Sequence, residues 1–125
     1  MSKRIEFNYY IGMPKAGTDK HQAFQEAVSR EASRLMGGCT VTYRHGYWVE
    51  GAEITQTRYV GHLEKEVCFH LQVSVETIRK HEINYVMRAC IRQEALFYGL
   101  DLNWVHVTTH VVEEHHFQVK PGESR

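Results

Sequence analysis

Carboxylates and aromatic rings gather in one stretch of this sequence, and their types indicate possible chemistry. The acidic members are Glu50, Glu53, Glu64 and Glu66, and the aromatic members are Tyr47, Trp48 and Tyr59. Aromatic rings can stack on a flat ligand such as a purine, while a carboxylate or a π face attracts a sulfonium or ammonium group. The stretch is a candidate site for a flat, cationic ligand. The same residues also fit a solvated strand end beside the edge of a core.

The nine histidines raise the question of a metal site. His106 and His110 share one face of an expected strand, but four strand residues separate them by roughly 13 Å, too far to share an ion. His115 and His116 are adjacent and would point to opposite faces. Because no metal-binding motif is present, we predict no metal site and no cofactor.

A thiol nucleophile is conceivable at Cys68, since His70 lies two residues further along the same expected strand. Nothing in the sequence orients the histidine as a base, and a buried, unreactive cysteine is a common alternative.

The loop from Gly12 to Gly17 could present backbone N–H groups and Lys15 to an anion. It lacks the Gly-Lys-Ser/Thr ending of a P-loop, so a simple glycine-proline connector is the other interpretation.

The elements that must position these residues follow from the hydrophobic periodicity. Alternation predicts strands over 5–11, 40–48 and 66–73, a further strand from about 104, and a weaker strand or ordered loop over 54–60. Helical spacing predicts helices near 19–36 and 75–98. An Asp19–Gln22 capping box and Ser74 would begin these helices, and Gly37-Gly38 and Gly99 would end them.

The order strand, helix, strand, strand, helix, strand predicts an α+β fold, the ferredoxin-like β-α-β-β-α-β two-layer sandwich. Its sheet is antiparallel, and right-handed crossovers place both helices on one face. We predict a single domain over 1–125, with a flexible tail at about 118–125. The predicted buried stripe of the second helix contains Val75, Ile78, Tyr85, Val86, Ala89, Leu96 and Phe97.

The sheet face away from the helices is expected to be rich in aromatic and histidine residues. Its predicted members are Tyr10, Thr42, Arg44, Cys68, His70, Gln72, Trp104, His106 and His110. Such a face is too aromatic to be simply solvated, which indicates a subunit interface or the floor of a ligand site. We therefore expect a homo-oligomer.

Composition narrows the functional class. Lys plus Arg and Asp plus Glu both number 15, so no net field favours nucleic acid or an anionic membrane. No signal-peptide core and no run of about 18 apolar residues is present, so we expect no membrane segment. Three scattered cysteines without a CxxC pair are typical of reduced thiols, which favours a cytoplasmic protein.

Two resemblances add to this interpretation. The segment from Tyr9 to Gly17, with Gly38-Cys39-Thr40-Val41-Thr42 and Gly46-Tyr47-Trp48, resembles a family of small uncharacterised bacterial proteins. The layout of the whole chain resembles the phage-encoded S-adenosylmethionine (SAM) lyases, formerly called hydrolases. In that family a tyrosine segment precedes the third strand and a glutamate lies at its start, places held here by Tyr59 and by Glu64 or Glu66. The family's tyrosine-arginine-glutamate run is not reproduced, because Val60 follows Arg58-Tyr59.

The second resemblance implies a homotrimer that binds SAM between subunits and acts in the cytoplasm of a phage host. The reaction would convert SAM to methylthioadenosine and homoserine lactone, with Glu64 or Glu66 as the catalytic carboxylate. The expected ligand-binding residues are Lys15, Tyr47, Trp48, Arg58 and Tyr59. The alternative is an oligomeric module that sequesters a nucleotide-like ligand without catalysis. Arg44, Arg58 and Lys15 would then meet its phosphates.

Overall fold

The computed structural model of the chain describes residues 2–49, 63–102 and 104–120. Its elements follow the predicted order: β1 (Ser2–Gly12), α1 (His21–Met36), β2 (Thr40–Val49), β3 (Leu63–Glu76), α2 (Lys80–Phe97) and β4 (Val105–Glu114). Short 3-10 turns at Thr18–Lys20 and Thr77–Arg79 lead into the two helices. The predicted weak strand over 54–60 lies outside the described residues.

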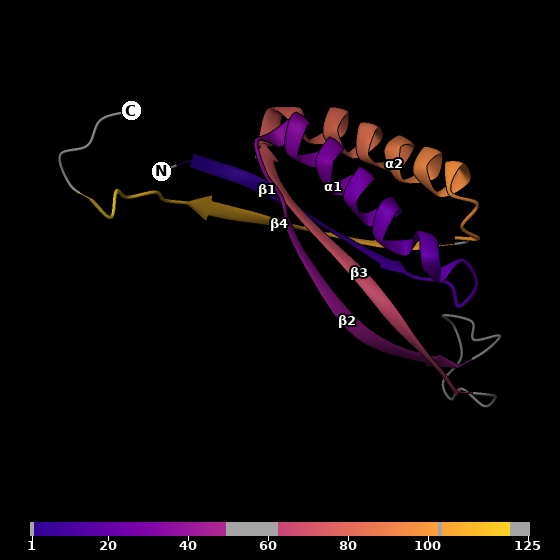
Figure 1. The fold of residues 1–125 in the computed structure, drawn as a ribbon. Coiled ribbons are helices and arrows are strands. Elements are labelled where there is room, and N and C mark those ends of the chain that lie inside the picture. The colour runs from indigo at the N-terminus through magenta and orange to yellow at the C-terminus, as the bar shows by residue number, and fades with distance from the viewer. Residues whose placement is uncertain (1, 50–62, 103, 121–125) are drawn as a thin grey trace.

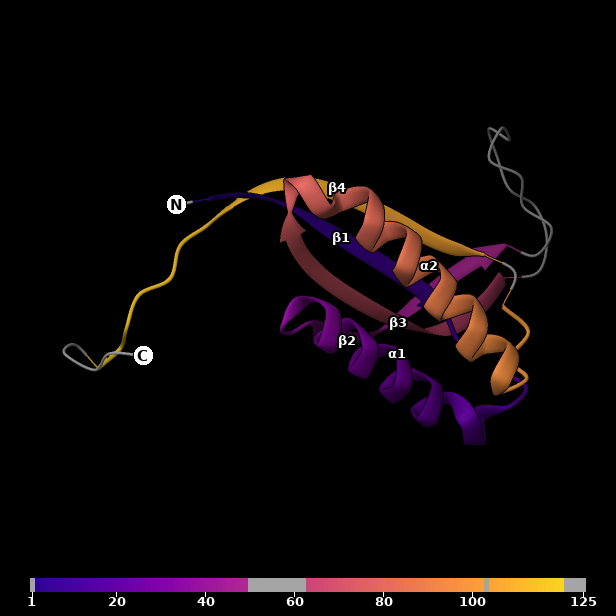
Figure 2. The same ribbon diagram turned by 90° about the horizontal axis from the view of Figure 1, so that it is seen from above.

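Four strands form one antiparallel sheet in the order β2-β3-β1-β4. Both helices cover the same face of this sheet (Figures 1 and 2), and the other face has no helix on it among the described residues. This is the ferredoxin-like sandwich, so the predicted fold class is confirmed. The two central strands, β1 and β3, place their residues at the middle of the uncovered face, which we call the open face.

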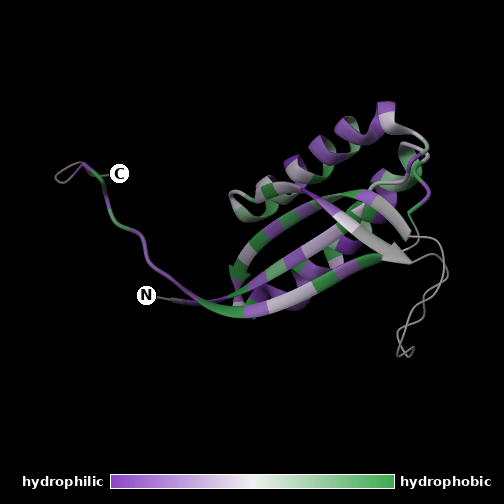
Figure 3. Ribbon diagram, turned by 90° about the horizontal axis from the view of Figure 1, so that it is seen from below, coloured by the Kyte–Doolittle hydropathy of each residue, from purple (hydrophilic) through white to green (hydrophobic). Residues whose placement is uncertain are grey.

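The core lies between the sheet and the helices. Along β1 the alternate residues Phe7, Tyr9 and Ile11 are buried, and Phe69 and Leu71 of β3 join them. Figure 3, which views the sheet from below, shows hydrophobic and hydrophilic residues alternating along the strands. This alternation is the two-residue period of a strand with one covered face. It sends the intervening residues to the open face.

The start of α2 differs from the prediction. β3 continues through Ser74 and Val75 to Glu76, and the helix begins only at Lys80. Ser74 does not cap the helix, because its hydroxyl donates to Glu114 and accepts from Arg4 Nε at 3.1 Å. Val75 is buried, as predicted, but as a strand residue paired with Ile5. The sheet therefore takes three residues that the sequence pattern had assigned to the helix and its cap.

The predicted buried stripe of α2 is wrong at four positions. Ile78, Tyr85, Leu96 and Phe97 are all exposed. The helix instead buries Ile83, Met87, Cys90, Ile91 and Ala95. Four of these residues recur every four positions, and Cys90 lies three positions after Met87, so the helix is amphipathic but rotated relative to the predicted stripe.

The predicted glycine ends of both helices are confirmed, whereas the predicted start of α1 is wrong. Gly37, with φ of 82°, ends α1 and donates its N–H to Ser33 O at 2.8 Å, as the glycine pair predicted. Gly99, with φ of 66°, follows α2 in the same left-handed conformation. The Asp19–Gln22 capping box is wrong, because no side chain caps α1 and Gln22 instead hydrogen-bonds Glu26.

Candidate functional site

A chain of hydrogen bonds crosses the open face from β1 to β2. Glu6 Oε1 accepts from Asn8 Nδ2 at 3.0 Å, and Asn8 Oδ1 lies 2.8 Å from His70 Nε2. On the other side of the imidazole, His70 Nδ1 lies 2.9 Å from Thr42 Oγ1. Gln72 Nε2 also donates to Glu6 Oε1, at 2.7 Å. Asn8 and His70 are 3% and 6% exposed, so the centre of this face is a satisfied, buried polar network.

The direction of the chain determines the state of His70. The Glu6 carboxylate can only accept, so the Asn8 amide nitrogen faces it and the Asn8 oxygen faces the histidine. His70 therefore donates a hydrogen bond from Nε2 to Asn8 and, when neutral, accepts a hydrogen bond at Nδ1 from the Thr42 hydroxyl. Burial, and secondarily the charge of Arg44, lowers the pKa of His70, while the charge of Glu6 acts in the opposite direction. Neutral His70 is the form that this face favours.

An aromatic stack covers the histidine. The rings of Tyr10 and His70 lie 4.4 Å apart between centroids with an interplanar angle of 11°. His106 of β4 lies on the other side of Tyr10, at 5.9 Å and 41°. The register aligns Thr42, His70, Tyr10 and His106 in one row across all four strands. The row therefore brings three rings, those of His70, Tyr10 and His106, to the centre of the open face.

Glu66 of β3 also lies on the open face, next to the end of β1. Its carboxylate occupies the space beside Gly12, where a Cβ would overlap it. Gly12 and Tyr10 are alternate residues of one strand, so the carboxylate lies roughly 7 Å along the strand from the aromatic row. Burial raises the pKa of Glu66. The glycine thus makes room for a half-buried carboxylate next to a ring stack.

Arg44 and Cys68 complete this end of the face, where they are register partners. Burial and the neighbouring charge of Glu66 raise the pKa of the Cys68 thiol, against smaller lowering effects of a backbone hydrogen bond from Ile11 and the charge of Arg44. A raised pKa disfavours the thiolate, which is the nucleophilic form. The Cys68–His70 pair is therefore poorly suited to nucleophilic catalysis. Arg44 is an exposed cation close to Cys68 and His70.

The sequence-predicted site residues divide into four groups. Glu66 has a described side chain, on the open face. Tyr47, Trp48 and Glu64 belong to the paired backbone of β2 and β3, where Trp48 is the partner of Glu64, but their side chains lie outside the described part. Arg58 and Tyr59 lie wholly outside the described residues. Lys15 is exposed in the loop that follows β1.

The open-face prediction needs one correction and two additions. Trp104 precedes β4 and lines a groove beside α2, so it does not belong to the open face. Glu6 and Asn8 were not recognised, although they precede Tyr10 by four and two residues and therefore share its face. Their alternation with Phe7 and Tyr9 was the available signal. What the alternation could not show is that they hydrogen-bond to one another and to His70.

Two further features of the described residues bear on function. No group of three or more His, Cys, Asp or Glu side chains in the described ranges could hold a metal ion. None of the helices in the same ranges is long and apolar enough to cross a membrane.

Comparison with known proteins yields distant structural likeness only. No protein-family model matches the chain, and no curated protein sequence matches it. Among solved structures, GlnK of B. subtilis matches with 13% identity and a TM-score of 0.36, over 86% of this chain and 85% of GlnK. A hydantoinase/carbamoylase family amidase from Burkholderia ambifaria matches with 14% identity and a TM-score of 0.40, over 90% of this chain but 28% of the amidase. Scores this low carry no functional inference, so the fold class rests on the sheet and helices themselves.

Proposed function

We propose that the open face binds a nucleoside-like ligand and that the chain is a SAM lyase forming methylthioadenosine and homoserine lactone. The observation that carries the proposal is the half-buried carboxylate of Glu66 beside the Tyr10–His70 ring stack. An aromatic platform next to a carboxylate suits a ligand that joins a purine to a cation. SAM has this combination, with its adenine and its sulfonium.

The proposed reaction needs no protein nucleophile. A carboxylate oxygen of SAM attacks its own γ-carbon, the bond from that carbon to sulfur breaks, and the electron pair stays on sulfur as neutral methylthioadenosine. The ring that closes is homoserine lactone, so atoms and charge balance without water or a cofactor. The protein then contributes by holding the folded conformation of the substrate and by shaping the electric field around the sulfonium.

Each residue has a distinct proposed role. Tyr10, supported from behind by His70, stacks on the adenine, and Glu66 faces the sulfonium. Arg44 meets the substrate carboxylate and orients it for attack. Glu64 is the other carboxylate to test. Lys15, Tyr47, Trp48, Arg58 and Tyr59 remain proposed ligand contacts from the sequence resemblance.

The test is incubation of the purified protein with SAM, followed by chromatography for methylthioadenosine. We expect methylthioadenosine and homoserine lactone in equal amounts, with no methylated product. Release of adenosylhomocysteine would indicate methyl transfer, and recovery of intact SAM after prolonged incubation would contradict the enzyme proposal.

A second candidate function is favoured by Arg44. Its guanidinium is exposed on the open face and makes no hydrogen bond or ion pair with another described side chain. A free cation beside an aromatic stack also suits the phosphate and base of a nucleotide. In that case the protein would sequester a nucleotide without turnover. Calorimetric titration with AMP tests this nucleotide-binding function against the lyase. If the protein sequesters nucleotides, Arg44→Gln would abolish AMP binding while Glu66→Gln would leave it intact.

We further propose that the protein acts as a homotrimer in the cytoplasm of a phage host, with the ligand held between subunits. The aromatic row of one open face would then be covered by a neighbouring chain, which would exclude water from the substrate.

A further inference from the structure

A cavity lies on the helix-covered side of the sheet, between α2 and β4. It is a groove of about 610 Å³, within the usual range of small-molecule sites of about 300–1,000 Å³. Its floor consists of core residues, among them Tyr9, Ile91 and Leu100. Val105 and Val107 of β4 form the opposite wall and are only partly buried. α2 therefore leaves the helix-facing side of the edge strand β4 incompletely covered.

The rim of this groove is divided into a cationic part and an apolar part. Arg88, Arg92 and Leu96 line it at successive turns of α2, which places Leu96 roughly 12 Å along the helix axis from Arg88. Leu96 is 83% exposed, and Trp104, which faces the same groove, is 90% exposed. The arginines lie towards one end, and the exposed apolar side chains lie towards the other.

The arginines carry charge that the described residues do not compensate. Arg88 Nε donates to Asn84 Oδ1 at 3.2 Å, and that oxygen also accepts the Tyr9 hydroxyl at 3.0 Å. Neither Arg88 nor Arg92 forms an ion pair with a carboxylate in the described part of the chain. Two unpaired guanidinium groups above an apolar floor favour an occupant with an anionic head and an apolar body.

We propose that the α2–β4 groove binds an amphipathic anion, a medium-length acyl chain with a carboxylate head. The carboxylate pairs with Arg88 and Arg92, and the acyl chain lies along α2 over Ala95 towards Leu96 and Trp104. This site is separate from the open face, because it lies on the helix-covered side of the sheet, and it does not depend on the proposed lyase activity.

Decanoate is the probe, and isothermal titration calorimetry is the measurement. We expect saturable binding of one decanoate per chain, with decanol, which lacks the charge, binding at least about tenfold more weakly. Arg92→Gln should weaken decanoate binding about tenfold while leaving decanol unaffected. Arg34→Gln is the matched control, because Arg34 is exposed on α1 and pairs with Glu31; it should leave decanoate binding unchanged.

A second variant tests the cavity itself. Ala95 is a small residue in the groove wall, so Ala95→Phe should fill the space and abolish binding of both probes. Circular dichroism and the urea midpoint check that this variant folds, and Leu96→Glu at the exposed rim gives the same test without a core change.

The proposal is wrong if decanol binds as tightly as decanoate, if Arg34→Gln acts like Arg92→Gln, or if no decanoate binds. It is also wrong if sedimentation shows a dimer that Leu96→Glu dissociates, since a second copy would then fill the groove.

Discussion

The residues of the open face act as a connected group, so a change at one of them alters the state of the next. His70 is held by Asn8 on one ring nitrogen and by Thr42 on the other. Asn8 is in turn oriented by Glu6. Glu66 differs from these residues, because what fixes its position is the missing side chain of Gly12. The network and the carboxylate therefore call for different tests.

Glu66→Gln tests the proposed catalytic charge. Glutamine keeps the shape but removes the charge, so we expect SAM turnover to fall by about 100-fold or more, with little change in unfolding free energy. Glu113→Gln, at an exposed position on β4, should retain full turnover. Burial raises the pKa of Glu66 above the ordinary glutamate value of 4.5. As the pH is lowered, Glu66 should therefore become protonated, and wild-type activity should start to fall, while the pH is still above 4.5.

Gly12→Ala should reproduce the effect of Glu66→Gln without removing any charge. The added methyl group would displace the flexible carboxylate rather than the backbone, so turnover should fall while stability changes little. The rate is measured by methylthioadenosine release and stability by urea unfolding. Full activity in both Gly12→Ala and Glu66→Gln would exclude Glu66 from the site, and Glu64→Gln would then be the variant to measure.

His70 should make the protein less stable in mild acid. Its pKa is lowered in the folded state, whereas the unfolded chain takes up the proton near the ordinary value of about 6.5. The stability contributed by neutral His70 is therefore complete above about pH 6.5 and is lost as the pH falls below that value, down to the folded-state pKa. Urea unfolding at pH 7 and pH 5 should show a smaller loss for His70→Gln than for the wild type. An equal loss in both proteins would show that other groups cause the acid sensitivity.

At the scale of the elements, α2 shows how burial selects one helix face. Met87 and Tyr85 are two residues apart, yet Met87 is fully buried and Tyr85 is 76% exposed. The helix packs on the sheet through Ile83, Met87 and Ile91, so the face that carries Tyr85 points away from the core. The larger ring is thus on the side that contributes less to folding.

Met87→Ala and Tyr85→Ala form a matched pair on this helix. Met87→Ala should lower the unfolding free energy by about 2–5 kcal/mol, because it removes buried methylene and sulfur contacts and leaves a cavity. Tyr85→Ala should change it by less than about 0.5 kcal/mol, since the ring is solvated. Urea unfolding by circular dichroism measures both. Similar losses in the two variants would mean that the helix is rotated from the orientation described.

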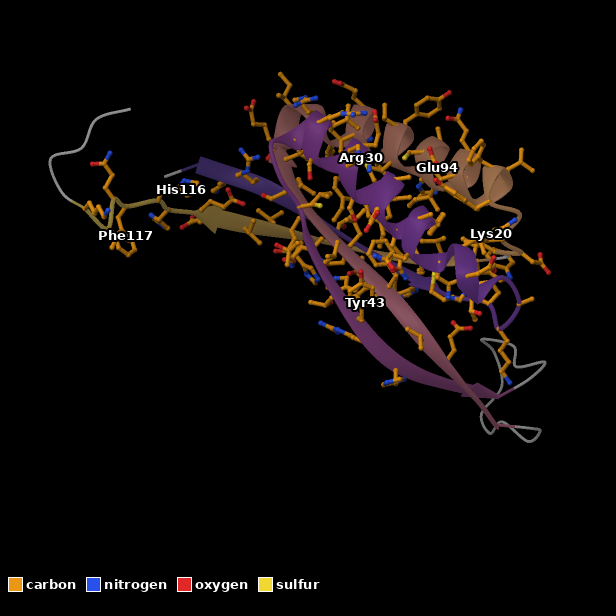
Figure 4. All side chains as sticks on the ribbon, viewed as in Figure 1. Lys20, Arg30, Tyr43, Glu94, His116 and Phe117 are labelled. Carbon is orange, nitrogen blue, oxygen red and sulfur yellow. The ribbon has the colours of Figure 1, made fainter. Side chains whose placement is uncertain are left out.

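At the scale of the whole molecule, the β2–β3 hairpin extends beyond the helices. In Figure 1 it curves away from α1 and α2, and Tyr43 of β2 is labelled on it in Figure 4. Tyr43 is 61% exposed, and Val41 and Val67 near it are also exposed. These side chains lie on the helix-facing side of the sheet, because Tyr43 is the strand partner of Phe69. Exposed apolar side chains of this kind favour contact with another chain.

Sedimentation velocity at micromolar concentration should give a mass three times the 14.6 kDa of one chain. Tyr43→Asp should shift the protein towards the monomer, because a charge would be buried in the proposed contact. Tyr85→Asp, at an exposed residue of α2, should leave the trimer intact. A wild-type monomer at this concentration would contradict both the trimer and a ligand site built between chains.

The element order and most of the open face followed from the sequence by itself; Trp104 was wrongly included in that face, and Glu6 and Asn8 were missed. Alternation along 5–11 and 66–73 reports a strand with one covered face, and the Gly37-Gly38 pair reports a helix end, because both are properties of the local backbone. Tyr10, His70 and Arg44 were assigned to the open face by the same two-residue period. Glu64 and Glu66, by contrast, could not be distinguished from the sequence.

Only the tertiary structure decided where β3 ends, which face of α2 is buried and which open-face residues touch. Pairing with Glu6 and Ile5 keeps Ser74 and Val75 in the sheet, although their sequence suits the start of a helix. Packing against the sheet, and not the helical pattern of the sequence, decided that Met87 is buried and Tyr85 exposed. Glu66 lies beside Gly12 because β1 and β3, more than fifty residues apart, are antiparallel neighbours in one register. Local periodicity reports the conformation of the backbone, whereas register and burial depend on partners that are distant in the chain.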